Sequence, residues 1–307
     1  MNKKNSKIII AGANGFIGSF LSKKLKSNYD VTSLGCSKNS FEKNYVALDL
    51  TDKEKVSKFV ENAPLFDVLI FLVGLAHKKG RGKEIGSFRQ INKQTLMNLT
   101  LGLDKKDRLP AKIIFASTIS VYGEKINQKF YYEDSNTEPF SPYAITKLEA
   151  EEFLLKHYSA QSWILRFAPV YSSNFQLNIN RRSKVKDWYY KIGDGTNRFS
   201  LCSVVNIGVV VQGILDNIIP PGLFNISDRK NYTYIDLLNY MNADWIIKIP
   251  MSAIKVLHYV GKMMNIVFLN ENSIKLISDN LYPCDKITKY IELPAELNDS
   301  KSVKQII

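Results

Sequence analysis

The segment Lys7–Gly18 reads KIIIAGANGFIG, and it decides the fold of this chain. A β-branched run, three regularly spaced glycines and an amphipathic stretch to Leu25 predict a strand, a tight turn and a helix. Gly12 permits the turn, Gly15 lets the backbone approach a pyrophosphate, and Gly18 lets the helix pack close to the strand. The N–H groups at the start of the helix would face the phosphates, so the segment predicts a dinucleotide site. The predicted contacts in this turn are Gly12, Asn14, Gly15, Phe16, Ile17 and Gly18.

The residues after the second predicted strand bear on the choice of cofactor. That strand spans 30–34, and Gly35, Cys36, Ser37 and Lys38 follow it. In NAD-binding proteins, a carboxylate at this position holds the ribose 2′-hydroxyl. Here no carboxylate is present, whereas the hydroxyl of Ser37 and the cation of Lys38 suit a 2′-phosphate. We therefore favour NADP over NAD, with the alternative that Lys38 is an ordinary loop lysine.

Further strand-like runs alternate with helical stretches through the first half of the chain. They span 45–48, 67–73, 112–116 and 163–167, and one more buried strand is predicted at 222–228. This alternation predicts an α/β fold with a parallel, doubly wound sheet, which binds ligands at the carboxyl ends of its strands. The predicted contacts at these ends are Asp49, Leu50, Val73, Gly74 and Ser117, and a helix over about 85–103 carries Asn92.

A tyrosine and a lysine in the segment 138–155 provide the candidate chemistry. Prolines end any earlier element there, and the residues that follow are strong helix formers with apolar positions at helical spacing. Tyr143 is therefore predicted to open a helix, with Lys147 one turn later on the same face. An ammonium beside a phenol favours the phenolate and lowers the phenol pKa, which suits proton transfer. The alternative is an ordinary pair on a helix surface, because this spacing is common.

The composition is that of an ordinary globular protein. The chain has 307 residues, of which 45% are hydrophobic and 23% charged. No apolar run is long enough to span a membrane, and the N-terminus lacks the features of a signal peptide. The three cysteines and three histidines are scattered, so we expect no disulfide framework, no metal site and a location in the reducing cytoplasm.

The net charge of the chain is +13. Its lysines are spread along the whole chain, so we favour a solvated surface over nucleic-acid binding. In residues 174–198, cations alternate with aromatic side chains, which could clamp a nucleotide diphosphate and stack its base. Nucleic-acid contact and an exposed polar lobe are the alternatives. An apolar stretch over 254–269 is interrupted by Lys255, His258 and Lys262, so we expect a packed helix rather than a membrane-surface helix.

Together these motifs resemble those of the extended short-chain dehydrogenases/reductases, the nucleotide-sugar epimerase and dehydratase family. The resemblance spans roughly residues 7–230. Beyond the glycine turn, Asp49 falls on the family's adenine-contacting position and Thr118 on its catalytic serine or threonine. Tyr143 and Lys147 fall on its Tyr-x-x-x-Lys pair, and Asn92 matches a helix asparagine that often supports the active site.

The resemblance implies a Rossmann-type domain with a smaller, mostly helical C-terminal substrate lobe. Residues 1–168, with about 202–227, would form the dinucleotide-binding domain, and residues 169–201 and 228–307 would form the lobe. Lys147 would hold the nicotinamide ribose and lower the pKa of Tyr143, which would exchange a proton with a sugar oxygen held by Thr118. The implied substrate contacts are Ala76, Thr118, Ser120, Asn174, Arg182 and Arg198.

Departures from the family pattern limit the reactions that the resemblance implies. Ile119 and Ser120 stand where dehydratases carry Asp-Glu, which argues against dehydration. The asparagine at position 206 is a variant that resembles the pattern of members from surface-polysaccharide gene clusters. Those members reduce or epimerise UDP-N-acetylhexosamine derivatives at carbon 4. Phe199 takes the place of a usual arginine, which leaves Arg182 and Arg198 as candidate phosphate ligands. The resemblance thus implies a 4-keto reductase, slightly favoured because NADPH usually serves as an external reductant, or a 4-epimerase.

Two non-catalytic interpretations are also open. One is a dinucleotide sensor on the same fold, although such proteins typically lack the pair formed by Tyr143 and Lys147. The other is an RNA-binding relative that uses the positive charge. The oligomeric state is open too, although relatives often form homodimers through the helices that contain Asn92 and Tyr143.

Overall fold

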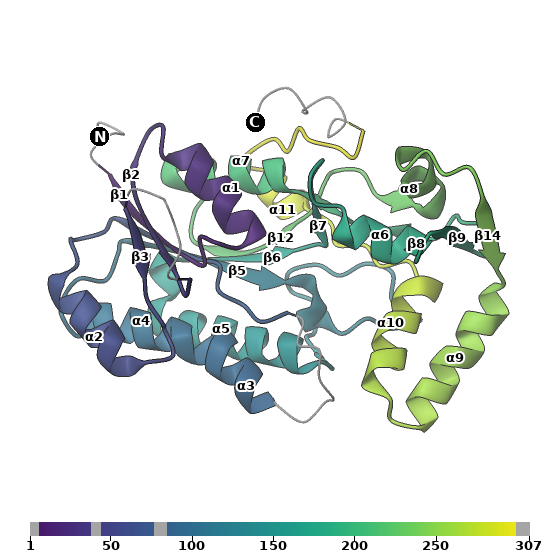
Figure 1. Cartoon of the computed structure of the whole chain (residues 1–307), viewed down its shortest axis with the longest axis horizontal. Helices are drawn as coiled ribbons and strands as arrows, with labels where there is room; N and C mark the ends of the chain where they lie inside the picture. Colours follow the sequence, from purple (N-terminus) through teal and green to yellow (C-terminus); the bar gives the residue numbers. More distant parts are fainter. Residues whose placement is uncertain (1–5, 38–43, 77–84, 299–307) are drawn as a thin grey trace. The chain divides into compact units, whose positions relative to one another are not determined.

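The computed structural model describes residues 6–37, 44–76 and 85–298 of the chain, which forms two compact units (Figure 1). Unit 1 comprises residues 1–118, 142–165 and 220–223, and unit 2 comprises residues 119–141, 166–219 and 224–307. The expected dinucleotide-binding domain, residues 1–168 with about 202–227, differs from unit 1, because residues 119–141, 166–168, about 202–219 and 224–227 fall in unit 2.

A seven-stranded parallel sheet is the central element of the fold. Its strands are β1 (Lys7–Ala11), β2 (Asp30–Gly35), β3 (Tyr45–Ala47), β4 (Val68–Phe71), β5 (Lys112–Thr118), β6 (Ser162–Phe167) and β12 (Gly222–Ile226). They follow the order β12-β6-β5-β4-β1-β2-β3, and the strand pairs around β1 and β4 run parallel. The predicted α/β fold is therefore confirmed. The strand order reverses between β1 and β4, and open sheets of this kind bind ligands at such a switch point.

The helices of unit 1 cover both faces of its strands. In Figure 1, α1 (Phe16–Leu25) lies on one face, and α2 (Lys53–Asn62), α4 (Thr95–Asp104) and α5 (Pro142–Tyr158) lie on the other. Successive side chains of a strand point to opposite faces, so the odd-numbered residues of β1, β4 and β5 share one face. They pack with the second group of helices in one core, which includes Ile9, Leu69, Phe71, Ile113, Phe115, Leu96, Leu99 and Leu154.

The stretch from 85 to 104 is helical, as the sequence predicts, but it is not one α-helix. It consists of α3 (Ile85–Arg89), a π-helical turn η2 (Gln90–Gln94) and α4. A π-turn holds one extra residue and changes the direction of the side chains around it, and such turns are frequent at functional sites. Asn92 lies in this turn and is fully buried.

Unit 2 is built from shorter elements. Its helices are α6 (Leu177–Ser183), α7 (Val204–Leu215), α8 (Tyr234–Tyr240), α9 (Met251–Met263), α10 (Val267–Ile277) and α11 (Asp285–Thr288), and a short 3-10 turn spans Ile119–Tyr122. A second 3-10 turn, Ser159–Gln161, belongs to unit 1. The strands of unit 2 are β7 (Val170–Tyr171), β8 (Lys184–Val185), β9 (Trp188–Ile192), β10 (Arg198–Phe199), β11 (Cys202–Ser203), β13 (Tyr232–Thr233) and β14 (Ile246–Ile249). They form three small sheets, β10-β13, β11-β7 and β14-β9-β8. The expected mostly helical lobe therefore contains more strand than its sequence suggests.

A buried carboxylate organises the interior of unit 2. Asp228 accepts hydrogen bonds from the hydroxyls of Tyr171 (2.6 Å) and Tyr232 (3.0 Å) and from the side-chain amide of Asn206 (2.8 Å). Burial raises the pKa of Asp228 to about 6, although these hydrogen bonds oppose the rise. Asn206 also exchanges two hydrogen bonds with the backbone of Ala295. In this structure, Asn206 therefore holds α7 in place within unit 2.

Over the described ranges, no helix has the length and apolar character needed to cross a membrane. Among the same residues, no three His, Cys, Asp or Glu side chains are grouped so that they could hold a metal ion.

Candidate active site

Two glycines fix the turn at the switch point between β1 and β4. Gly12 has φ of +87°, a conformation that residues with a Cβ rarely adopt. A Cβ at Gly12 would lie 3.0 Å from the backbone of Leu72 and Val73, so the turn passes directly against the end of β4. At Gly18, a Cβ would lie 2.2 Å from the carbonyl oxygen of Gly12. Only glycine at these positions allows α1 to begin this close to β1.

The start of α1 fits the pyrophosphate of a nicotinamide dinucleotide. The helix begins after Gly15, and no side chain caps it. Backbone N–H groups in a first helical turn have no partner within the helix and lie at the positive end of the helix dipole. Gly15 places no side chain between this backbone and an incoming anion. The predicted contacts Asn14, Phe16 and Ile17 lie in the same turn, and together these features suit phosphate binding.

The loop after β2 is tied to the glycine turn through Tyr45, which sequence reasoning missed. The Tyr45 hydroxyl donates to the carbonyl oxygen of Ser37 (2.8 Å) and accepts from the side-chain amide of Asn14 (2.9 Å). Ser37 is exposed at this position, whereas Lys38 lies outside the described residues. Their contact with a 2′-phosphate stays a prediction.

The residues after β3 have local partners. One carboxylate oxygen of the exposed Asp49 accepts from the backbone N–H (2.9 Å) and the hydroxyl (2.7 Å) of Thr51. The carbonyl oxygen of the buried Leu50 accepts from Asn98 of α4 (2.9 Å). These bonds hold the loop at the carboxyl end of β3, and the adenine contact of Asp49 stays a prediction.

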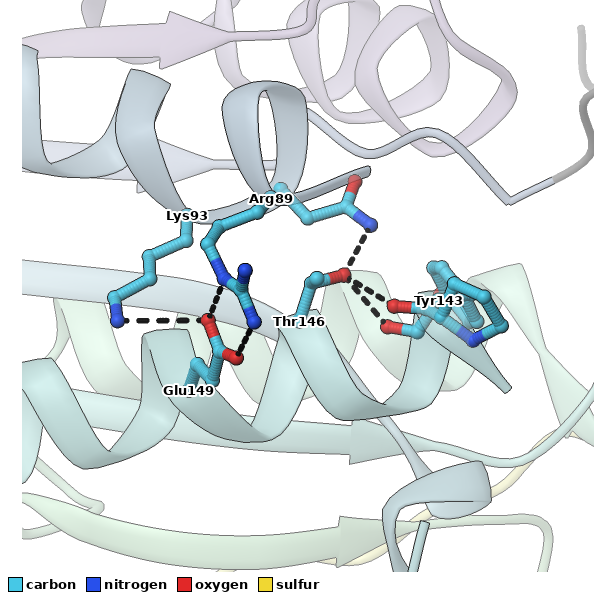
Figure 2. Close-up of polar contacts among 7 residues, drawn as sticks. Arg89, Lys93, Tyr143, Thr146 and Glu149 are labelled. Atoms are coloured by element: carbon cyan, nitrogen blue, oxygen red, sulfur yellow. Dashed lines mark hydrogen bonds and ion pairs between the residues drawn. The ribbon is translucent and has the colours of Figure 1, made fainter. Parts of the chain in front are cut away.

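Asn92 joins the end of β4 to the first turn of α5. Its side-chain oxygen accepts from the backbone N–H of Leu75 (2.6 Å), and its amide nitrogen donates to the hydroxyl of Thr146 (2.9 Å). The Thr146 hydroxyl in turn donates to the carbonyl oxygens of Pro142 (2.7 Å) and Tyr143 (3.1 Å), as Figure 2 shows. This chain of hydrogen bonds positions the turn of α5 that carries Tyr143.

Lys147 lies beneath the carboxyl ends of two neighbouring strands. Its ammonium donates to the carbonyl oxygens of Val73 (3.1 Å) and Ala116 (2.9 Å), just beyond β4 and within β5. A Cβ at Gly74 would lie 3.2 Å from the Lys147 nitrogen, so a side chain there would press against the ammonium. Burial lowers the pKa of Lys147 to about 7, and the nearby Glu151 carboxylate opposes that shift. Ala76, a predicted substrate contact, is exposed in the same loop.

Tyr143 and Thr118 share a side-chain hydrogen bond, and Lys147 lies one turn beyond Tyr143 on the same helix, all within unit 1. Burial raises the pKa of Tyr143 to about 12, and the bond to Thr118 only partly offsets this effect. The expectation that Lys147 lowers the phenol pKa is therefore wrong for the protein alone. Removal of the phenolate from water costs more free energy than its hydrogen bond to Thr118 recovers, so the neutral phenol is favoured.

A buried acid, missed by the sequence analysis, lies one turn beyond Lys147 on α5. Glu151 is fully buried, and the hydroxyl of Ser117 donates to its carboxylate. Ser117, a predicted cofactor contact, therefore orients a carboxylate that helps to keep Lys147 protonated. Helical spacing could have revealed this acid, because Glu151 follows Lys147 by four residues.

The outer side of α5 carries an ion-pair cluster that also escaped the sequence analysis. Arg89 of α3 donates to both carboxylate oxygens of Glu149, at 2.7 and 2.5 Å. Lys93 of the π-turn lies 3.5 Å from the same carboxylate (Figure 2). A bidentate arginine fixes orientation as well as distance. The cluster therefore holds α3 and the π-turn against α5 at Glu149, which follows Tyr143 by six residues.

The remaining predicted substrate contacts belong to unit 2 and differ in their surroundings. Ser120 is partly buried in a 3-10 turn, and Asn174 is exposed. Arg198 is exposed and pairs with Asp279 at 3.5 Å. Arg182 lies over the ring of Phe199, 5.4 Å from its centroid, and its Nε has no hydrogen-bond partner among the described residues. Burial lowers the pKa of Arg182, and the nearby tyrosines and the Glu124 carboxylate oppose that shift.

Replacement of Lys147 by methionine is expected to change how stability depends on pH. An unfolded lysine keeps its proton to a pKa near 10.4, whereas Lys147 loses it near 7 when folded. Between these values the unfolded chain binds more protons, so wild-type stability rises with pH. From about pH 7 to about pH 9, urea unfolding of wild type should gain about 2 kcal/mol relative to Lys147→Met. Lys156→Met, at an exposed site in the same helix, serves as the control, and equal pH slopes for Lys147→Met and wild type would contradict the prediction.

Comparison with known proteins gives a consistent result. Residues 8–226 match the NAD-dependent epimerase/dehydratase family. The chain is 22% identical over 240 residues to the N-acetyl-α-D-glucosaminyl-diphospho-ditrans,octacis-undecaprenol 4-epimerase of Escherichia coli O157:H7, an alignment that covers 76% of this chain and 68% of that protein.

Solved structures of similar fold include a UDP-glucuronic acid 4-epimerase from Bacillus cereus in complex with NAD, at 21% identity and a TM-score of 0.71, which covers 96% of this chain and 94% of that one. A dTDP-4-dehydrorhamnose reductase from Bacillus anthracis in complex with NADP is similar at 16% identity and a TM-score of 0.71, which covers 97% and 98%. At these identities the likeness supports the fold.

Proposed function

This chain belongs to the NAD-dependent epimerase/dehydratase family, and we propose that it acts by hydride transfer at carbon 4 of a nucleotide-linked sugar. The proposed reaction is 4-keto reduction or 4-epimerisation of a UDP-N-acetylhexosamine derivative. One observation supports the proposal: Tyr143 shares a hydrogen bond with Thr118 at the end of β5, and Lys147, one turn later on α5, donates to carbonyl oxygens just beyond β4 and within β5.

Each of these side chains would have a different role in the reaction. Tyr143 would give a proton to, or take one from, the sugar oxygen at carbon 4, and Thr118 would hold that oxygen in line. Lys147, held by two carbonyl oxygens, would present its remaining donor capacity to the ribose of the cofactor. A bound nicotinamide would supply or accept the hydride at the sugar carbon. Asn92 and Thr146 would act indirectly, because they fix the turn that carries Tyr143.

Arg182 is the better candidate for the substrate diphosphate. Arg182 is partly buried, and a buried guanidinium nitrogen without a partner costs stability unless a bound group completes it. Arg198, in contrast, already has Asp279 as its partner. A diphosphate is common to UDP-sugars and to the lipid-linked sugar in the name of the Escherichia coli relative, so the diphosphate is the part of the substrate that Arg182 supports. The hexosamine itself rests on the sequence pattern around Asn206.

The choice between reductase and epimerase depends on the cofactor. A reductase exchanges its dinucleotide with solution, whereas an epimerase retains it and uses it again. The absence of a carboxylate from residues 35–38 favours NADP, and with it reduction. Epimerisation follows as the second candidate, because the same proton-transfer residues serve both reactions.

Mass spectrometry of small molecules released from the purified protein is the first test. We expect the protein to emerge empty or with NADP, and then to oxidise NADPH in the presence of a UDP-4-keto-N-acetylhexosamine. Tightly held NAD, with interconversion of UDP-N-acetylglucosamine and its 4-epimer, would instead establish the epimerase.

A different result would contradict the proposed function as a whole. A protein that binds neither dinucleotide and turns over no nucleotide sugar would not be this enzyme. A salt-dependent RNA mobility shift under physiological ionic strength would then favour the RNA-binding alternative.

A further inference from the structure

The helix α9 buries only one of its faces. Ile254, His258 and Gly261 are buried, and the His258 ring forms a hydrogen bond of 3.1 Å with Ser273 of α10. This side follows the expected packed helix. The rest of α9, however, exposes several large apolar side chains, whereas the outer surface of a packed helix is usually polar.

The opposite face of α9 is apolar and open to solvent. Val256, Tyr259 and Met263 are 62%, 63% and 80% exposed. Residues in a helix follow one another at about 100°, so these three side chains project from one side, roughly opposite Ile254 and His258. Val260 and Met264 extend the same surface, which we call the apolar face of α9. Just before β14, the adjacent strand in the sequence, Trp245 is 82% exposed.

Positive charge flanks this face. Lys255 and Lys262 are exposed and lie seven residues apart, so they project from the same flank of α9. The sequence of α9 contains no aspartate or glutamate, and the chain as a whole carries a net charge of +13. Lysines can extend their ammonium groups from such a position toward phosphates while their methylene stems cover apolar surface. The partner of this face should therefore offer an apolar region for the exposed side chains and negative charge for the lysines.

We propose that the apolar face of α9 docks on the surface of an anionic phospholipid bilayer. A helix of 13 residues is about 20 Å long, which is too short to span a bilayer but suits a helix that lies in its plane. Such helices bury aromatic and aliphatic side chains at the headgroup boundary and pair their lysines with lipid phosphates. A second copy of the chain is a poorer occupant. A symmetric contact would bring the same lysines together without an acid from α9 to offset them.

Sedimentation with large unilamellar vesicles tests the proposal on the full chain. Vesicles of phosphatidylcholine alone are compared with vesicles that also contain phosphatidylglycerol. We expect binding to the mixed vesicles, weaker binding at higher salt, and a loss of about tenfold or more in partitioning for the double variant Val256→Glu/Met263→Glu. Leu65→Glu is the matched control, because Leu65 is an apolar residue of unit 1 with 66% exposure, and this variant should bind as wild type does.

Three results would overturn the inference: no binding to anionic vesicles, equal binding by the double variant, or equal losses in the double variant and the control. Light scattering of the protein alone adds a fourth. A dimer in solution that Val256→Glu/Met263→Glu dissociates would assign the face to a second copy. Thermal unfolding of each variant confirms that the substitutions leave the fold intact, as expected for exposed sites. None of these measurements requires turnover, so their outcome is independent of the proposed reaction.

Discussion

Tyr143→Phe is expected to reduce turnover by about 10²- to 10⁴-fold and to leave dinucleotide affinity close to that of wild type. The substitution removes one hydroxyl and keeps the ring, so the packing at the start of α5 stays. The lost oxygen is the group that shares a hydrogen bond with Thr118 and would exchange a proton with the sugar. Lys147 keeps its bonds to Val73 and Ala116 in this variant, and with them its proposed place beside the cofactor. Steady-state rates and dinucleotide titration measure the two effects separately.

Tyr158→Phe is the matched control for this experiment. Tyr158 lies at the other end of α5, and its hydroxyl donates to Asp104 at 2.9 Å. Loss of that hydroxyl should lower stability slightly and leave the rate unchanged. Near-normal turnover of Tyr143→Phe would remove the phenol from the mechanism. Equal losses in both variants would point to damage of α5 rather than to chemistry.

Gly18→Val is expected to abolish dinucleotide binding and to lower the free energy of unfolding by about 3 kcal/mol. The new Cβ would lie 2.2 Å from the carbonyl oxygen of Gly12 and 2.8 Å from Cα of Ala13. Both are backbone atoms, so no side chain can rotate away and α1 must move from β1. The N-terminus of α1 then no longer faces the switch point, and the phosphate site is lost with it. Cofactor titration and chemical denaturation are the measurements.

Gly86→Ala provides the comparison. Gly86 lies in α3, and a Cβ there would meet no atom within 4 Å. Alanine is the better helix former, so this variant should be unchanged or slightly more stable. Normal dinucleotide binding by Gly18→Val would contradict the assignment of the glycine turn, whereas a loss in both variants would indicate a general sensitivity to glycine replacement.

The sequence predicted those features that depend on local pattern. The order of strand, glycine turn and helix in Lys7–Gly18, the alternation of later elements and the helix that begins beside Tyr143 all follow from neighbours in the chain. Their spacing therefore identified the parallel sheet, and it placed the candidate site residues at the carboxyl ends of its strands.

Features that depend on contacts between distant residues were not predictable in this way. Nothing in the composition of 90–94 marks a π-turn, and the partners of Asn92 come from two other elements. The pKa of Tyr143 rises because of burial, which a sequence does not display. The sequence could not choose between Arg182 and Arg198 either, because the choice depends on which one already has an acidic partner.

The π-turn also has a consequence for how such a site can be copied or lost. Removal of one residue from Gln90–Gln94 would restore a regular helix and rotate everything on one side by about 100°. Asn92 would then face elsewhere, although every side chain of the proposed active centre would still be present. An alignment that scores identities column by column would rate the shortened chain as intact. A designer who grafts this centre onto another scaffold must therefore transfer the length of the turn together with its amino acids.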